Sequence, residues 1–168
     1  MPAGTAPALR IVAATESDVP VLLSFVRKLA EYEKLSDQVE ATEEHVRAAL
    51  FGEGRVAEAL LAYLGSEPVA FAVFFHNFST FLGRPGIYLE DLFVDPPHRG
   101  KGIGKALLIE LARIARARNC GRLEWAVLDW NESAIEFYRS LGAVPMDDWT
   151  IFRVTGTALA RLAGEETS

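Results

Sequence analysis

The chain has 168 residues, half of them hydrophobic, which suits one compact core and is short for two. Its net charge of −6 argues against a nucleic-acid partner, since proteins that bind phosphate backbones carry a clustered basic face. The single cysteine, Cys120, excludes an internal disulfide and favours a reducing compartment. We find neither a signal peptide nor a stretch of the ~20 apolar residues that a membrane span needs. These features predict a cytoplasmic protein without a membrane partner.

The whole chain, residues 1–168, is expected to form one domain with loose ends at 1–8 and 164–168. Residues 9–13 predict a short strand. An apolar stripe between Val19 and Ala30 predicts a helix, with Ser17 or Asp18 as its cap and a proline in its first turn.

A second, shorter helix is expected to begin after Thr42 and to end near Gly52. Residues 57–64 and 69–76 then predict two strands of a hairpin, joined by a turn at 65–68. The first of these strands, with the sequence EALLAYL, also fits a helix.

The second half of the chain alternates strands and helices. We expect strands at 87–94, 123–128 and 149–154, and helices at 104–119 and 133–141. Antiparallel strands followed by strand–helix–strand–helix predict an α/β (α+β) domain, in which helices cover both faces of a mixed sheet.

A glycine-rich turn, DPPHRGKGIG at 95–104, lies between a predicted strand and the long helix. Its three glycines let the backbone direct N–H groups toward one point, where the N-terminus of the helix adds further free N–H groups. Arg99, Lys101 and Lys105 add mobile positive charge suited to a pyrophosphate. A tight turn with solvated cations is the structural alternative. The P-loop and dinucleotide patterns do not match this segment.

Two adjacent carboxylates, Glu90 and Asp91, interrupt an apolar strand. Neighbouring strand residues point to opposite faces, so either a bulge bends the strand or one carboxylate points inward. An edge strand with one satisfied acid is the plain alternative. A partly buried carboxylate needs a partner or a task, and one such task is to attract a protonated amine and accept its proton.

The segment Arg99–Gly104 resembles the R-x-x-G-x-G/A turn that holds the pyrophosphate of CoA in the GNAT superfamily of N-acetyltransferases. Other stretches resemble its diamine and thialysine acetyltransferase branch, in order along the chain: LAEYE at 29–33, YLEDLFV at 88–94, AVLDWN at 126–131, FY at 137–138 and LGA at 141–143. The resemblance implies the GNAT fold with a mostly antiparallel sheet, acetyl-CoA as co-substrate, no metal, and a homodimer.

The resemblance also implies a role for each matching residue. Glu90 binds the amine and removes its proton, directly or through a water, and Tyr138 protonates the leaving thiolate. A bulge at the end of the strand, at residues 92–94, would direct one N–H group at the acetyl carbonyl. The CoA-binding positions are Leu92, Phe93, Val94, Arg99, Gly100, Lys101, Gly102, Ile103, Gly104, Lys105, Asn131, Ser133 and Ala134. The amine-binding positions are Tyr32, Glu33, Glu90, Asp91, Glu124, Trp125 and Ala126.

Together these features predict direct acetyl transfer, in a ternary complex, to a primary amine of a small cationic substrate, with a lysine-like (thialysine) ε-amine favoured. Polyamines are the nearest alternative, and aminoglycosides or a protein lysine stand further back. A CoA-binding regulatory module without turnover would lack Glu90 or Tyr138, and both are present. For Phe137 and Tyr138 taken alone, plain packing would be the better interpretation, and the preceding DWNE sequence reverses it.

Overall fold

The computed structural model describes residues 7–165 and divides into two compact units, one ending at Leu128 and the other beginning at Asp129. The expectation of a single domain stays a prediction. The predicted loose ends fall largely outside the described residues. Within 7–165, no helix has the length and apolar character needed to cross a bilayer.

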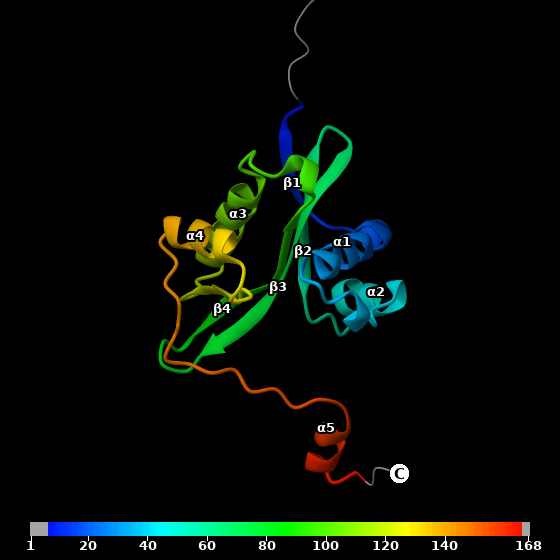
Figure 1. The fold of residues 1–168 in the computed structure, drawn as a ribbon, viewed down its shortest axis with the longest axis vertical. Coiled ribbons are helices and arrows are strands. Elements are labelled where there is room, and N and C mark those ends of the chain that lie inside the picture. The colour runs from blue at the N-terminus through cyan, green and yellow to red at the C-terminus, as the bar shows by residue number, and fades with distance from the viewer. Residues whose placement is uncertain (1–6, 166–168) are drawn as a thin grey trace, which may run out of the picture. The chain divides into compact units, whose positions relative to one another are not determined.

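The first unit is built on a five-stranded sheet with the order β1-β2-β3-β4-β5. Neighbouring strands are antiparallel from β1 to β4, while β4 and β5 are parallel. The predicted mixed, mostly antiparallel sheet is therefore confirmed (Figure 1). The strands are β1 (Leu9–Ala13), β2 (Glu58–Leu64), β3 (Glu67–Ser79), β4 (Arg84–Val94) and β5 (Leu123–Trp125).

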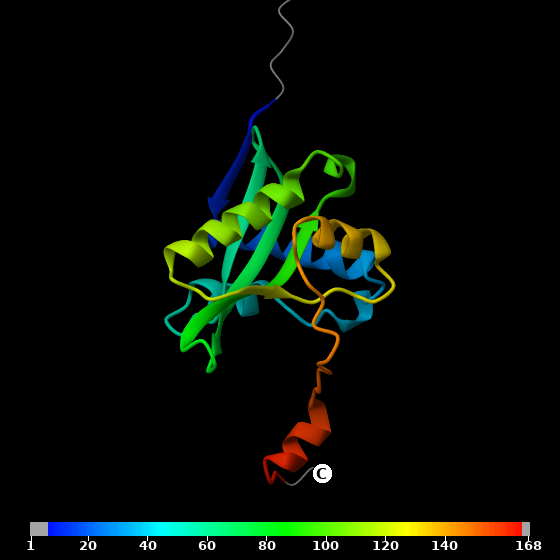
Figure 2. The same ribbon diagram turned by 90° about the vertical axis from the view of Figure 1, so that its left-hand side faces the viewer.

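Helices cover both faces of this sheet. α1 (Val19–Tyr32) and α2 (Glu43–Phe51) lie on one face, and α3 (Ile103–Ala117) lies on the other (Figures 1 and 2). α1 begins after Asp18 with proline in its first turn, and Thr42 caps α2 by accepting from the His45 N–H at 3.2 Å. Both helix starts agree with the sequence prediction.

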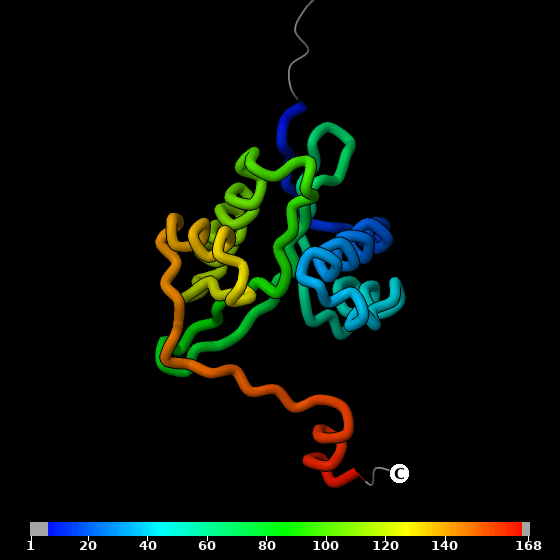
Figure 3. The backbone as a smooth tube through the Cα atoms, in the orientation of Figure 1, coloured from blue at the N-terminus to red at the C-terminus, as the bar shows by residue number. Residues whose placement is uncertain are grey.

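The long hairpin of β3 and β4 lies between the helices of the two faces (Figure 3). On the α1 face, Phe25 stacks on Phe71 with ring centroids 5.4 Å apart and lies 6.2 Å from Phe93. On the other face, Leu107 and Leu111 of α3 are completely buried. Since each buried large apolar side chain stabilises the fold by about 1.5–3 kcal/mol, β3 and β4 are held from both sides.

The second unit contains α4 (Glu132–Ser140) and α5 (Gly156–Leu162). The expected strand at 149–154 is wrong, because the segment pairs with no strand among residues 7–165, and Ile151 and Phe152 are 77% and 92% exposed. The expected strand at 123–128 is shorter than predicted and ends at Trp125. The sequence reasoning did not predict α5.

Candidate active site

The glycine turn, residues 95–105, follows β4 and leads into α3. Gly100 and Gly102 have φ angles of 75° and 77°, and a Cβ at either position would meet nothing within 4 Å. These glycines are therefore required by their backbone conformation, which other residues rarely adopt. The first helical hydrogen bond runs from Ala106 N to Gly102 O at 3.0 Å. The N–H groups of Ile103, Gly104 and Lys105 have no backbone acceptor among residues 7–165, which suits an anion.

The start of α3 packs closely on the end of β4. A Cβ at Gly104 would lie 3.7 Å from both Leu92 and Val94, so their side chains face α3. Ile103 is buried beside them, whereas Lys101 and Lys105 are exposed. The structure thus brings the predicted CoA positions of β4 and of the glycine turn together.

Arg99 is held in place, in contrast to the expectation of a mobile cation. Its Nε donates to the Val94 carbonyl at 2.9 Å, and its guanidinium carbon lies 4.4 Å from the ring centroid of Tyr32 and 5.3 Å from that of Phe93. Cation–π contacts of this kind contribute about 0.5–1 kcal/mol at exposed sites. Arg99 therefore connects the glycine turn to the end of α1.

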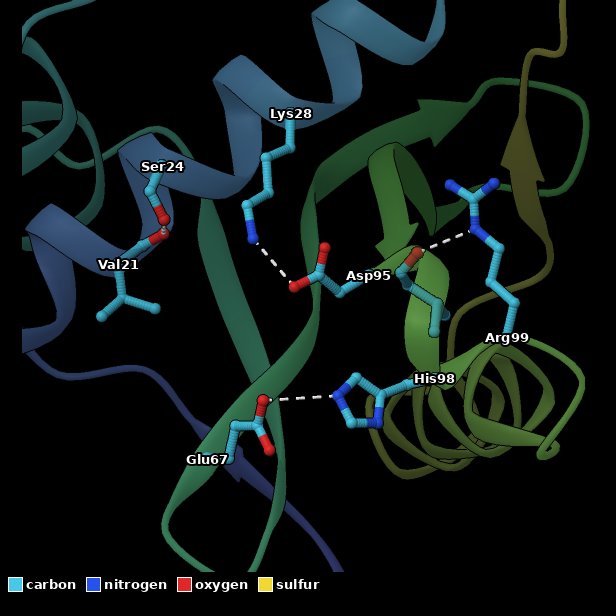
Figure 4. A network of polar contacts seen from close by, with 8 residues as sticks. Val21, Ser24, Lys28, Glu67, Asp95, His98 and Arg99 are labelled. Carbon is cyan, nitrogen blue, oxygen red and sulfur yellow. Dashed lines mark hydrogen bonds and ion pairs between the residues drawn. The ribbon is translucent and has the colours of Figure 1, made fainter.

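Two further polar contacts fasten the segment after β4. Lys28 of α1 forms an ion pair with Asp95 at 2.8 Å, and His98 Nε2 lies 3.4 Å from Glu67 Oε1 at the start of β3 (Figure 4). The first half of the glycine turn is thus anchored to two different elements.

A β-bulge places Glu90 as an extra residue in β4. Asp91 pairs with Val73 of β3 while Leu89 pairs with Phe74, so Glu90 has no partner across the strand. Leu89, its partner Phe74 and Leu92 all lie on the α3 side of the sheet; Arg118, at the end of α3, covers Phe74. Two residues, Glu90 and Asp91, therefore stand between Leu89 and Leu92, where a regular strand returning to the same face would have one. Of the two sequence alternatives, the structure contains the bulge.

The residue after the inserted one, Asp91, is half-buried on the α1 face. Burial, followed by the negative charges of Glu90 and Glu33, raises the pKa of Asp91 to about 6. Burial also raises the pKa of Glu33, which caps the C-terminus of α1. We call Glu33, Glu90 and Asp91 the acidic bulge. Since the negative charges of Glu90 and Glu33 disfavour ionisation of Asp91, a cation placed among the three would be bound favourably.

β5 places a further predicted amine-binding residue beside β4. Glu124 pairs with Tyr88 and Trp125 pairs with Leu89, two residues and one residue before the bulge. The Glu124 carboxylate lies 2.7 Å from Arg122 Nε and accepts from Asn77 Nδ2 at 3.0 Å. Trp125 is half-buried, and Ala126, beyond the strand, is exposed.

Sequence reasoning did not identify Asn77 or Arg122. One signal for Asn77 was available, because it continues the alternation of Phe71, Val73 and Phe75 and interrupts that apolar series. For Arg122 there was none, since a charged residue at a strand end is ordinary. Phe81, considered for an aromatic pocket position, is 99% exposed at the tip of the β3–β4 hairpin.

The second unit carries the remaining predicted residues on and before α4. Asn131 caps the helix by accepting from the Ala134 N–H at 3.3 Å and from the Ser133 hydroxyl at 3.3 Å. Tyr138 lies about two turns into α4, is half-buried, and has its ring 5.5 Å from that of Phe137. The cap therefore fixes the backbone at all three predicted CoA contacts of this unit.

Two other kinds of reactive site receive no support. Among residues 7–165, no group of three or more His, Cys, Asp and Glu side chains has a metal-binding arrangement. Cys120 is buried, which keeps its thiol from acting as an accessible nucleophile.

A glycine turn at a helix N-terminus beside an acidic strand suits an anionic co-substrate next to a cationic substrate, and comparison with known proteins gives the family. Residues 25–143 match the model of the Acetyltransferase (GNAT) family, so the chain belongs to that family. It is an N-acetyltransferase, and acetyl-CoA is the co-substrate of the family.

Similar proteins cover nearly the whole chain. Thialysine N-epsilon-acetyltransferase of Bos taurus is 41% identical over 163 residues, which cover 90% of this chain and 95% of that protein. L-ornithine N5-acetyltransferase of Arabidopsis thaliana is 31% identical over 196 aligned positions, covering 89% and 86%. A solved integron cassette protein of V. cholerae has a TM-score of 0.77 and 29% identity, covering 92% and 97%.

Proposed function

We propose that this protein transfers the acetyl group of acetyl-CoA to the side-chain amine of a small basic amino acid of the thialysine type. The acidic bulge carries the proposal, because it offers three carboxylates to a cation on the strand whose end meets the glycine turn. The names of the bovine and Arabidopsis relatives, for thialysine and ornithine, support a diamino acid over a polyamine.

The residues of the glycine turn fit the pyrophosphate of CoA. Its open glycines and free N–H groups present hydrogen-bond donors, while Lys101 and Lys105 add charge. The end of β4, residues 92–94, would bind the pantetheine arm, and Asn131, Ser133 and Ala134 would add contacts from the second unit. Acetyl-CoA supplies an activated thioester carbonyl when bound.

The acidic bulge prepares the amine for attack. A lysine-type amine has a pKa near ~10.4 and arrives protonated, whereas only the neutral amine is a nucleophile. Glu90, exposed at the bulge, accepts the proton directly or through a water, and Asp91 and Glu33 hold the cation nearby. Tyr138 then protonates the departing thiolate, since a phenol with a pKa of ~10 can donate to a thiolate whose conjugate thiol has a pKa of ~8.5.

We further propose a cytoplasmic homodimer. Large apolar side chains of the second unit are exposed in the single chain, and burial against a second copy would remove them from water. They include Val144, Met146, Trp149, Ile151 and Phe152. Light scattering at micromolar concentration tests this, and a mass near 18.4 kDa would contradict it.

The activity itself is tested by measuring CoA thiol release with thialysine, lysine, ornithine, spermidine and an aminoglycoside. Thialysine should give the highest kcat/KM. A preference for spermidine would favour the polyamine alternative, and acetyl-CoA binding without turnover of any amine would favour a regulatory module.

A further inference from the structure

Three polar side chains meet where β3, β4 and β5 join. Glu124 contacts both Arg122 and Asn77, as described above, and the side chains of Arg122 and Glu124 are 39% and 36% exposed. Gly86 makes room for them: a Cβ there would clash with Asn77 Oδ1 and lie 3.0 Å from Arg122 Cγ. We call Asn77, Arg122 and Glu124 the strand-end cluster.

The strand-end cluster lies on the same face as the acidic bulge. Glu124 pairs with Tyr88, whose ring lies 5.2 Å from that of Phe75. Phe75 is two residues after Val73, which packs in the core under α1. Glu90 lies two residues along β4 from Tyr88, and Tyr88 is the partner of Glu124 on the next strand. Strand geometry therefore puts the Cα atoms of Glu124 and Glu90 about 8 Å apart. The Arg122–Glu124 pair is therefore within reach of a small molecule held at the bulge.

The charges of the Arg122–Glu124 pair are complementary to those of a free α-amino acid. An α-amino acid carries an ammonium next to a carboxylate, and Glu124 and Arg122 carry a carboxylate next to a guanidinium. Arg122 contacts Glu124 through Nε, and its terminal amino groups donate no hydrogen bond to any residue in the range 7–165, so they are available to a carboxylate. A lysine-like chain spans about 6 Å from its amine to its α-carbon, which matches the separation of the two sites.

We propose that Arg122 binds the α-carboxylate of the substrate while Glu124 binds its α-ammonium, so that Arg122 selects diamino acids against polyamines. The proposal rests on the proposed function and deepens it. A polyamine would place its second ammonium at Glu124 but bring no carboxylate to balance the positive charge of Arg122. Arg122 thus acts on substrate choice, while Glu90 acts on the proton.

The experiment compares thialysine with bis(2-aminoethyl) sulfide, which keeps the thioether and both amines but lacks the carboxylate. Wild-type protein should prefer thialysine at least tenfold in kcat/KM per amine. Arg122→Gln should raise KM for thialysine about tenfold with kcat nearly unchanged, and leave kcat/KM for the sulfide unchanged or higher. Arg122→Lys should recover part of the thialysine affinity. Arg116→Gln, an exposed arginine in the last turn of α3, is the matched control and should change neither substrate.

Three results would overturn the proposal. The first is an equal kcat/KM for the two substrates in the wild-type protein, which would show that the carboxylate plays no part in recognition. An equal loss on both substrates in Arg122→Gln, with an unchanged melting temperature, would give Arg122 a role other than selection. If none of the amines tested supports thiol release, the proposed function is overturned and this inference with it. Turnover without a preference for the carboxylate would overturn the inference alone.

Discussion

The acidic bulge, centred on β4, and the glycine turn, which follows this strand, bind opposite charges in different ways. The turn presents an anion with backbone N–H groups, and glycine conformation decides its shape. The bulge presents a cation with carboxylate side chains, and one inserted residue decides their placement. A backbone site therefore leaves a sequence pattern, whereas a side-chain site depends on strand register, which no short motif contains.

The largest effect is expected outside both regions. Tyr138 is the proposed proton donor for the leaving thiolate, so Tyr138→Phe should lower kcat by ~10²–10⁴ while both substrates still bind. The wild-type rate should also decline at high pH as the phenol ionises, and the variant should lose that decline. Steady-state kinetics across pH 7–11 checks this.

The matched control is Tyr63→Phe on β2, which removes a hydroxyl that donates to Asp18 and should leave kcat unchanged. A kcat within twofold of the wild type in Tyr138→Phe, with the alkaline decline retained, would make Tyr138 a packing residue.

Removing the charge of the inserted residue tests the bulge. Glu90→Gln keeps the shape but loses the proton acceptor, so kcat/KM for the amine should fall by about 10²-fold, with acetyl-CoA affinity preserved. Glu53→Gln, at an exposed position after α2, is the control. Loss of acetyl-CoA affinity with normal amine turnover would show that Glu90 serves the binding of acetyl-CoA and not the amine.

Changing a glycine tests the turn. Gly102→Val should raise the KM for acetyl-CoA tenfold or more, about 1.4 kcal/mol, because valine resists a φ of 77° and covers the N–H groups. Gly83→Val separates strain from binding, since Gly83 has a φ of 61° with equally open surroundings at the hairpin tip. An unchanged KM in a folded Gly102 variant would remove the turn from CoA binding.

The smallest effect concerns stability at the bulge. The pKa of Asp91 is raised from 3.8 to about 6, so the folded state holds a proton that the unfolded chain releases, and stability falls as pH rises through this window. Asp91→Asn should therefore stabilise the protein at pH 7 by about 2 kcal/mol, a few degrees in Tm, and by much less at pH 4. Thermal melts at both pH values check this, with Asp37→Asn as the exposed control; an equal gain at both would contradict it.

Much of the fold could be predicted because its signals are local. Caps at Asp18 and Thr42, and the apolar stripes of α1 and α3, place these helices within one or two residues. The strand expected at 149–154 failed for a non-local reason, since alternating apolar residues form a strand only beside a partner. α5 was missed because its seven residues carry only two large apolar side chains.

The candidate site divides in the same manner. The glycine turn follows from its pattern, and the bulge was one of two possibilities at Glu90 and Asp91. The position of Arg99 over Tyr32 depends on how α1 ends beside β4, and 67 positions separate the two residues, so spacing could not predict it. The strand-end cluster likewise combines Asn77 of β3 with Arg122 and Glu124 at and before β5.

The bulge has a consequence for how easily this chemistry can be lost. Asp91 and Leu89 already pair with adjacent residues of β3, and their side chains already lie on alternate faces. Deleting Glu90 would therefore join them into an uninterrupted ladder in which every other residue keeps its partner and its face. The proposed proton acceptor is a single inserted residue in the β3–β4 ladder, and a one-codon deletion would remove that carboxylate while the other pairings of the ladder are kept.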